Sequence, residues 1–513
     1  MKAKCQVNSF NSKVFINLGI NKDKENDMKI AIIGFALSGF TFLKTIIDNN
    51  KNKDLKIDIF EKRKEYPVGL AYETDSLDKL LNVNNNEMIY PPEDRFDFTK
   101  WMEENNRFLD SVEKMAPRVY LGEYFKEQAE PYIRNPKVKI INEEALDIDV
   151  KISNKNELYI VGSENYEGEY DLVYLATGAT FYQDPYGLRG IKNYIPKPYP
   201  LSQNYEAIKD DDRLAILGTS ASSTDVFRYL TKNKNLNKTI EFFTGPNEYK
   251  IVDIPFEGDI YEYYSPNQAW IDKELSENGE ISKEKLINTI EADFKKAGYK
   301  IDYAYKTYKS HNLELSREAI EKNDQALAFT EDYFIQFALF VADLVNYMNP
   351  IDRADFVENY YPYLSFLGGK TPYGSMKMLL EAYDEGKIDV ITNTKSVNKN
   401  KDGSFTLTGD KVRKADVIIN ATGFEMELEK VAEKIPLFNS LVKNEMVMAD
   451  QNGNCIAATW PRLNPLSKKY GVLKNLYVTG MMVSQTDLDN NDARCIQKTA
   501  MTIAEIILEE NGL

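Results

Sequence analysis

The residues most suggestive of chemistry form a glycine-containing turn near the start of the chain. An apolar run at residues 30–33 leads into this turn, and Glu61 ends a second apolar run 22 residues after Gly39. In dinucleotide sites of this pattern, glycines allow the tight turn and the close packing of the following helix. The amino end of that helix receives a pyrophosphate, and the acid accepts a hydrogen bond from a ribose. Alanine replaces the middle glycine here, and the spacing still predicts a dinucleotide site formed by Gly34, Ala36, Leu37, Ser38, Gly39 and Glu61.

A second turn of this kind, at residues 218–223, departs further from the pattern. It follows an apolar run at 214–217, but serine stands at its middle and third positions. The next predicted strand, 239–243, ends in Thr-Gly-Pro, without the acid or arginine that reads the ribose of a nicotinamide cofactor. We expect at most weak binding of NAD(P)H, through Gly218, Ser220, Ser222 and Ser223. The alternative is a retained nucleotide domain that has lost its cofactor.

The strands around these turns indicate the fold. Residues 171–178 and 416–423 each read as a buried strand that ends in Ala-Thr-Gly, one on either side of the second turn. The first of these strands adds Thr177 and Gly178 to the predicted site. This arrangement favours an α/β protein with two Rossmann-like dinucleotide-binding domains, the first of them discontinuous, and a helical insert. The expected boundaries are a disordered N-terminal extension at 1–27, the first domain at 28–200 and 385–513, and the second domain with its insert at 201–384.

Several local motifs carry a resemblance to a known family. They are Gly-Leu-Ala-Tyr at 69–72, Leu-Leu-Asn-Val at 80–83, Phe-x-x-Trp at 98–101, Pro-Arg-x-x-x-Gly-x-Tyr at 117–124 and Asn-Leu-Tyr-Val-Thr-Gly at 475–480. With the glycine turns, the chain resembles the bacterial FAD-NAD(P)-binding family related to flavin-containing and N-hydroxylating monooxygenases. The resemblance implies FAD in the first domain. It also implies that Asn82 lies in the segment under the isoalloxazine ring and that Gly480 closes the FAD site.

Departures from the family pattern leave the reaction open. The aspartate that many flavoproteins place directly after the last strand is absent, and Met481 and Met482 stand there. The cysteines lack the spacing of a redox-active dithiol, so a disulfide-reductase mechanism is not expected. We expect an FAD-dependent oxidoreductase, monooxygenase-like and using NAD(P)H, that acts on an unidentified small molecule. The alternatives are a flavin-binding sensor with a degraded nicotinamide site, and an oxidase or dehydrogenase that uses no nicotinamide. No catalytic residue is nominated.

Composition narrows the class further. The net charge of −16 argues against nucleic-acid binding, and no apolar run has the roughly 20 residues that a membrane helix needs. The three scattered cysteines favour a reducing compartment, and we expect a cytoplasmic protein. The single histidine, His311, is expected on a helix surface, and no metal site is expected. Residues 334–348 have one apolar helical face, which predicts either a covering helix or a lid. The oligomeric state stays open.

Overall fold

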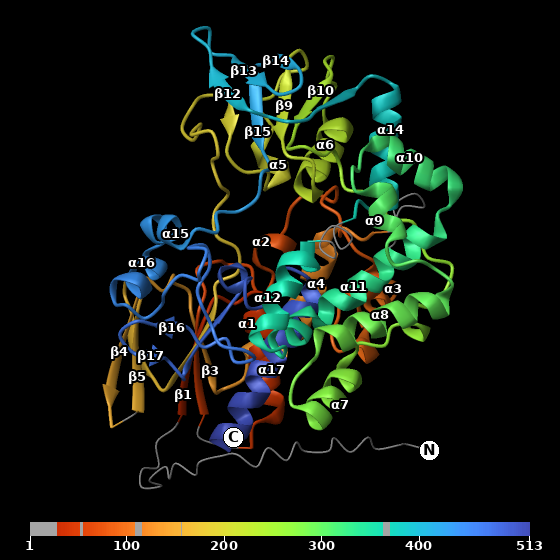
Figure 1. Cartoon of the computed structure of the whole chain (residues 1–513). Coiled ribbons are helices and arrows are strands. Elements are labelled where there is room, and N and C mark those ends of the chain that lie inside the picture. The colour runs from red at the N-terminus through yellow and green to blue at the C-terminus, as the bar shows by residue number, and fades with distance from the viewer. Residues whose placement is uncertain (1–27, 52–54, 108–114, 155, 363–369, 513) are drawn as a thin grey trace.

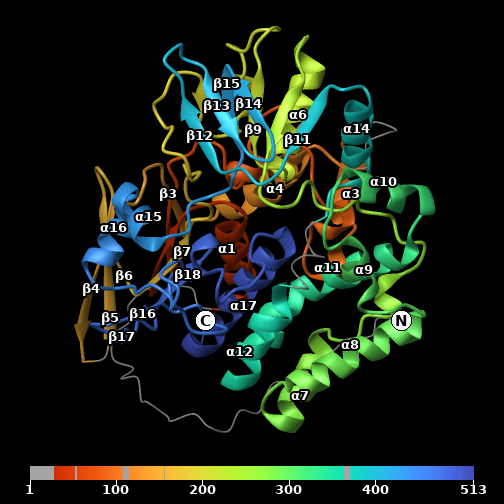
Figure 2. The ribbon, with the colours of Figure 1, turned by 45° about the horizontal axis from the view of Figure 1, so that its top comes forward.

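The computed structural model describes residues 28–51, 55–107, 115–154, 156–362 and 370–512, so the extension expected at residues 1–27 lies outside the described part of the chain. Figure 1 shows two sheet-containing parts stacked one above the other, with a column of helices alongside both. Figure 2 shows the same two parts with the upper sheet turned toward the viewer.

The lower part is built on a five-stranded parallel sheet in the order β18-β7-β1-β2-β3. Its central strands are continuous apolar runs because helices cover both faces of such a sheet. Helix α1 follows the first glycine turn and packs against α17, which is the last helix of the chain. The bounds are β1 Met28–Ile33, α1 Leu37–Asn49, β2 Leu55–Phe60, β3 Val138–Ile141, β7 Leu172–Ala176, β18 Leu476–Thr479 and α17 Ala493–Asn511.

The upper part repeats this plan with the parallel sheet β11-β10-β9-β15-β8. Helices α6 and α14 connect its strands, and α6 follows the second glycine turn. The bounds are β8 Tyr194–Ile195, β9 Leu214–Leu217, α6 Ala221–Asn233, β10 Ile240–Phe243, α14 Tyr373–Asp384, β11 Ile388–Ile391 and β15 Val417–Asn420. Because the chain contains two such sheets, the predicted α/β class with two Rossmann-like domains is confirmed.

Two predicted domain boundaries are wrong. The second Ala-Thr-Gly strand, β15, pairs with β9 of the upper sheet, so residues 388–420 do not return to the first domain. The reason is that in both domains the glycine turn makes the same close contact with an Ala-Thr-Gly strand. A Cβ added to Gly34 would lie 2.3 Å from the Ala176 carbonyl oxygen, and one added to Gly218 would lie 2.6 Å from that of Ala421. Each Ala-Thr-Gly strand therefore packs against the glycine turn of its own domain. Short β8, from the segment assigned to the first domain, also joins the upper sheet.

After Gly423 the chain runs back to the lower part. Helix α16 packs against β4 of the antiparallel sheet β4-β5-β6, and α15 packs against α16. A second antiparallel sheet, β12-β13-β14, extends the upper part, and β16 pairs with β17. The bounds are β4 Asp147–Ser153, β5 Asn156–Gly162, β6 Glu167–Tyr170, β12 Ser396–Lys399, β13 Phe405–Thr408, β14 Val412–Ala415, α15 Leu428–Lys434, α16 Pro436–Lys443, β16 Leu466–Ser467 and β17 Gly471–Val472.

The remaining helices fill the edge of both parts. In the lower part these are α2 Gly69–Tyr72, α3 Asp97–Glu104 and α4 Arg118–Ile133, with the short 3-10 turns η1 Asn85–Glu87, η2 Pro92–Asp94 and η4 Met481–Val483; α5 Leu201–Asn204 precedes β9. The insert between β10 and α14 holds η3 Ile260–Glu262, α7 Gln268–Asn278, α8 Lys283–Ala297, α9 Tyr303–Tyr308, α10 Leu313–Lys322, α11 Gln325–Asn346 and α12 Pro350–Asn359. None of the helices in the described ranges is long and apolar enough to cross a bilayer.

The insert differs from expectation at two points. Helix α11 buries most of its length instead of a single face, because other helices of the insert pack against it and α17 of the lower part lies beside it. His311 is buried, and its Nδ1 donates to the Tyr249 carbonyl oxygen at 2.7 Å. The expectation of a surface histidine is therefore wrong, and burial lowers the pKa of His311.

Candidate active site

The first glycine turn has the geometry of a dinucleotide cradle. Gly34 adopts φ +91°, which side chains disfavour, and a Cβ on Gly39 would lie 2.3 Å from the Gly34 carbonyl oxygen. Ala36 precedes α1, and no side chain caps this end of the helix. The first amides of α1 are therefore available to a bound anion, and the helix dipole favours negative charge there.

Glu61 stands at the end of β2, beside this turn. Its two carboxylate oxygens accept backbone hydrogen bonds from Phe35, at 2.9 Å, and from Arg63, at 2.8 Å. Each carboxylate oxygen has two lone pairs, so the group keeps acceptor capacity for a ribose hydroxyl. These two hydrogen bonds from backbone amides orient the Glu61 carboxylate toward the cavity that it lines.

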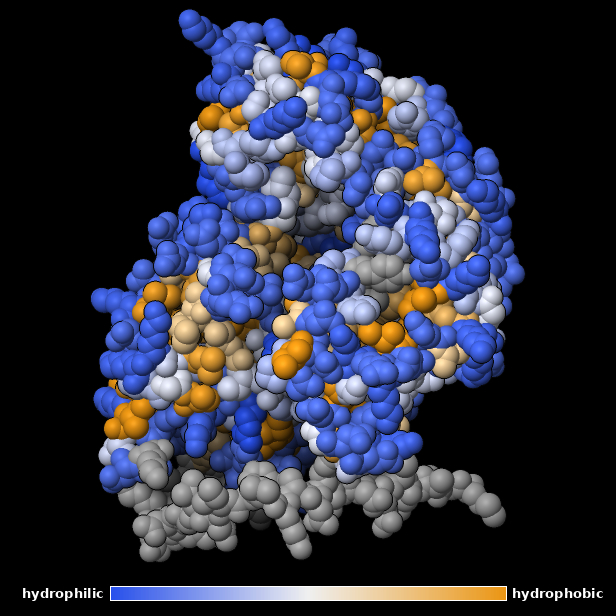
Figure 3. Space-filling model, in the orientation of Figure 1, coloured by the Kyte–Doolittle hydropathy of each residue, from blue (hydrophilic) through white to orange (hydrophobic). Residues whose placement is uncertain are grey.

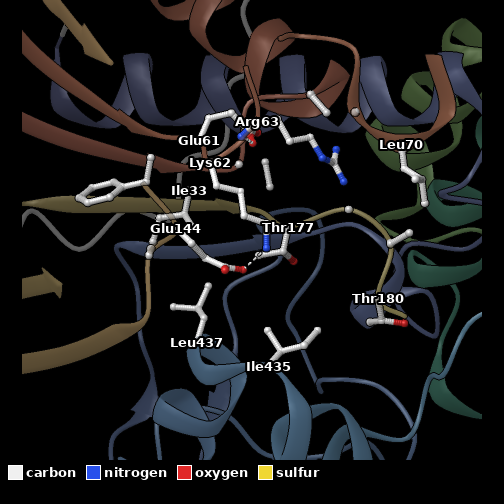
Figure 4. Close-up of a pocket in the computed structure, with 18 of the residues that line it drawn as sticks. Ile33, Glu61, Lys62, Arg63, Leu70, Glu144, Thr177, Thr180, Ile435 and Leu437 are labelled. Carbon is white, nitrogen blue, oxygen red and sulfur yellow. Dashed lines mark hydrogen bonds and ion pairs between the residues drawn. The ribbon is translucent and has the colours of Figure 1, made fainter. Parts of the chain in front are cut away.

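That cavity has a volume of about 530 Å³ and runs along the carboxyl ends of β1, β2 and β7. Figure 4 shows Glu61 and Arg63 on one side of this cavity. Leu437 of α16 and Ile435, the residue before α16, lie on the other side. Lys62 forms an ion pair with Glu144 at its edge. The predicted site residues that line this cavity are Gly34, Ala36, Glu61, Thr177 and Gly178.

A second cavity of about 260 Å³ continues from the first, because Ala36 and Gly178 line both. Leu37, Ser38 and Gly480 line it from the lower domain, and Ser222 lines it from the upper domain. Together the two cavities form an elongated space from the acid at β2 to the interface between the domains. Figure 3 shows a hollow between the upper and lower parts of the molecule. An elongated space of this kind suits a dinucleotide.

Two predicted residues are placed differently. Asn82, expected under the isoalloxazine ring, is exposed and lines a third cavity instead. Ser223 is buried, and its Oγ donates to the Ser220 carbonyl oxygen at 2.6 Å, so its hydroxyl serves the helix and not a ligand. Gly218 adopts φ +106° against Ala421, which is the geometry that Gly34 adopts against Ala176. Of the four residues predicted for the second turn, Ser222 lines the second cavity and Ser220 lines the third.

The sequence did not reveal one acidic residue of this site, Asp487. It lines the second cavity and is buried, and its Oδ1 accepts a hydrogen bond from the Thr499 hydroxyl at 3.2 Å. Burial raises the pKa of Asp487 to about 7, although nearby Lys498 acts in the opposite direction. Asp487 lies seven residues after Gly480 in an irregular loop, so the expected position directly after the strand gave no signal for it.

We expect the Asp487→Asn variant to change the pH dependence of stability. A raised carboxyl pKa means that the folded chain holds the proton more tightly than the unfolded chain does. The stability from this proton is complete below about pH 4 and is lost as the pH rises to about 7. The variant should therefore gain up to about 4 kcal/mol relative to wild type between pH 4 and pH 8. Urea unfolding of the FAD-free chain across this range measures it. The exposed Asp211→Asn control should run parallel to wild type, and an Asp487→Asn curve that does so as well would refute the expectation.

The fold and this site define a two-domain dinucleotide-binding protein. Residues 31–180 match the family model described as FAD-NAD(P)-binding, which confirms the resemblance for that segment and the first dinucleotide domain. A search of curated proteins gave no significant match.

Solved structures share the architecture along nearly the whole chain. L-lysine 6-monooxygenase from Pseudomonas syringae has a TM-score of 0.59 at 13% identity, covering 94% of this chain and 99% of its own. The FAD-bound cadaverine monooxygenase of Erwinia amylovora has a TM-score of 0.55 at 12% identity, with coverage of 96% and 95%. The ornithine N-hydroxylase of Kutzneria, with reduced FAD, NADP⁺ and L-ornithine, has a TM-score of 0.53 at 11% identity, with coverage of 95% and 100%. At these identities the likeness establishes the fold.

Proposed function

We propose that this chain is an FAD-dependent oxidoreductase that acts on a small molecule at the interface of its two dinucleotide domains. The observation that carries the proposal is the continuous cavity that begins at Glu61 and ends against Ser222 of the second domain. The Gly34 turn and the uncapped start of α1 fit a pyrophosphate, and Glu61 fits a ribose. When bound there, FAD would supply electron and hydride transfer.

Two tyrosines and one buried acid line the inner end of the cavity. Tyr182 and Tyr199 close it from the segment between the two sheets, and the Tyr199 hydroxyl donates to Asp225 of α6 at 2.7 Å. These rings line the space next to the second domain. At the same end, burial raises the pKa of Asp487 to about 7, so its carboxyl can take up or release a proton near neutral pH. The chain thus provides an interdomain space with one buried acid, Asp487, in its lining.

The second domain is proposed to deliver a nicotinamide cofactor weakly. Ser222 and Phe424, at the edge of this domain, line the second cavity. However, Ser220 is the residue before α6 in place of glycine, and Ser223 occupies the position at which Gly39 allows close packing in the first domain. These substitutions support low affinity without excluding use of the cofactor.

We expect NADH and NADPH to reduce the bound flavin with half-saturation no lower than roughly 100 μM and with little preference between them. Anaerobic stopped-flow measurement of flavin bleaching tests this. Saturation at low micromolar levels, or a hundredfold preference, would contradict the expected weak site. If neither cofactor bleaches the flavin, the chain is a sensor or an oxidase that uses no nicotinamide, and the cofactor part of the proposal fails.

We further propose a cytoplasmic protein without a nucleic-acid partner. The excess of acidic residues gives a net charge of −16, which opposes binding to phosphate backbones. Cys455 and Cys495 are buried free thiols, a state suited to a reducing compartment. Among the described residues no group of three or more metal-ligating side chains could hold a metal ion.

A further inference from the structure

The lining of the second cavity contains a single acidic side chain. Among the described residues that line this cavity, Asp487 is the one carboxyl group and Arg118 is the one cation. Asp487 is only 3% exposed, and its Oδ1 accepts the 3.2 Å hydrogen bond from the Thr499 hydroxyl. The hydroxyls of Ser38 and Thr479, also in the lining, bond to each other at 3.1 Å. A neutral hydroxyl is therefore the hydrogen-bond donor that the described part of the chain supplies to Asp487.

Each nearby cation already has a carboxylate partner other than Asp487. Lys498 of α17 forms an ion pair with Asp343 of α11, and Arg118 of α4 pairs with Asp225 of α6 at 3.4 Å. Within the described ranges of the chain, no ion pair joins Asp487 to a cation. Because a buried carboxylate without a paired cation is costly, the ionisation of Asp487 depends on the charge of whatever occupies the cavity.

Other titratable groups that face Asp487 are Tyr174 of β7, Cys495 of α17 and Asp489 of the loop that also carries Asp487. Burial raises the pKa of Tyr174 to about 12 and that of Cys495 well above its ordinary value, so both are uncharged near neutral pH. Asp489 is the acceptor of a 3.4 Å hydrogen bond from the Tyr361 hydroxyl. Burial also raises the pKa values of the tyrosines in the cavity lining, which are Tyr72, Tyr182 and Tyr199. Asp487 is thus the group that both lines the cavity and changes its charge near pH 7.

The order of the two cavities sets the position of this acid relative to a bound dinucleotide. With FAD bound as proposed above, Glu61 receives a ribose and the amino end of α1 receives the pyrophosphate. Residues 36–38, at that amino end, also line the second cavity. The part of FAD beyond the pyrophosphate, which carries the flavin, therefore continues into the space that Asp487 lines.

We propose that Asp487 couples reduction of the bound flavin to the uptake of a proton from solvent. The inference rests on the proposed function. A hydride from a reduced nicotinamide, which is oxidised in the step, brings two electrons and one proton to the flavin and so adds one unit of negative charge. This charge disfavours a carboxylate beside it. The Asp487 carboxylate then forms an O–H bond with a solvent proton, which offsets the added charge. By reciprocity, an ionised Asp487 makes the flavin harder to reduce.

The midpoint potential of the flavin in the FAD-bound full chain, measured anaerobically against a reference dye over a pH series, tests the proposal. The diagnostic variant is Asp487→Asn, whose side chain cannot ionise. Below about pH 6, where the wild-type carboxyl is protonated, the two proteins should have the same potential. Above about pH 7 the wild-type potential should fall increasingly below that of the variant, because the carboxylate then opposes reduction.

Asp489→Asn is the matched control, because it makes the same change in the same loop. Asp489 is not in the lining of the cavity, and its φ of +56° suits asparagine. This control should follow wild type. Thr499→Val should move the divergence from Asp487→Asn to higher pH, because the lost hydrogen bond stabilises the carboxylate form. A purely structural role for Asp487 would not produce this shift.

Three results would overturn the inference. The first is that the potentials of wild type and Asp487→Asn run parallel over the whole pH series. The second is that Asp489→Asn has the same effect as Asp487→Asn. The third is that the Thr499→Val curve coincides with that of wild type. In each case a normal FAD content leaves the proposed function standing, whereas a chain that binds no FAD would refute the proposed function and the inference together.

Discussion

The Gly39→Ala variant is expected to purify without flavin and to bind added FAD at least a hundredfold more weakly than wild type. The new methyl group would lie 2.3 Å from the Gly34 carbonyl oxygen and 3.3 Å from the Ile32 side chain. Backbone atoms cannot yield as a flexible side chain can, so α1 must move away from β1. The movement displaces the helix amino end from the position where a pyrophosphate would lie. The visible absorbance of the purified protein and fluorescence titration with FAD measure the effect.

Gly162→Ala is the matched control for this change. Gly162 lies in β5, its φ is not in the left-handed region, and an added Cβ would meet only the Asp147 Cβ at an ordinary 3.8 Å. This variant should retain FAD. If Gly39→Ala purified with full flavin content, the first turn would not be the pyrophosphate site. Circular dichroism shows whether loss of flavin reflects loss of the fold.

The Arg494→Met variant is expected to lower the free energy of unfolding by about 3–5 kcal/mol, the range for removal of one partner from a buried ion pair. Arg494 lies in α17 with 4% side-chain exposure, and it pairs with Glu87 of η1. Its guanidinium also donates to the Ile335 carbonyl oxygen of α11 at 3.4 Å. The substitution leaves the partly buried Glu87 carboxylate, at 17% side-chain exposure, without this cation. It also removes a link between α17 of the lower domain and the helical insert.

Chemical denaturation of the wild type and variant measures this loss. Lys44→Met removes one partner of the exposed pair with Asp48, whose side chains are 47% and 40% accessible, and should cost under about 1 kcal/mol. Adding Glu87→Gln to Arg494→Met should restore part of the lost stability, because no uncompensated charge then remains. An Arg494→Met variant no less stable than Lys44→Met would show that the buried pair contributes little.

The local sequence determined the first dinucleotide turn. The apolar run of β1, the positions of Gly34 and Gly39 and the distance to Glu61 are properties of one continuous strand-turn-helix-strand unit. Within such a unit, backbone sterics and strand spacing place the residues with little help from the rest of the chain. In the structure, Gly34 and Gly39 make the close backbone contacts for which glycine was expected at these positions.

Tertiary structure alone decided how the remote segments combine. Both Ala-Thr-Gly strands have the same local pattern, and only pairing with β1 or β9 assigns each to a domain. Asp487 lies in a loop whose position depends on α17, and His311 is buried by contacts with Tyr249 far along the chain. The third cavity joins two helix ends from either side of the long insert. Such placements follow from long-range packing, which strand and helix periodicity do not encode.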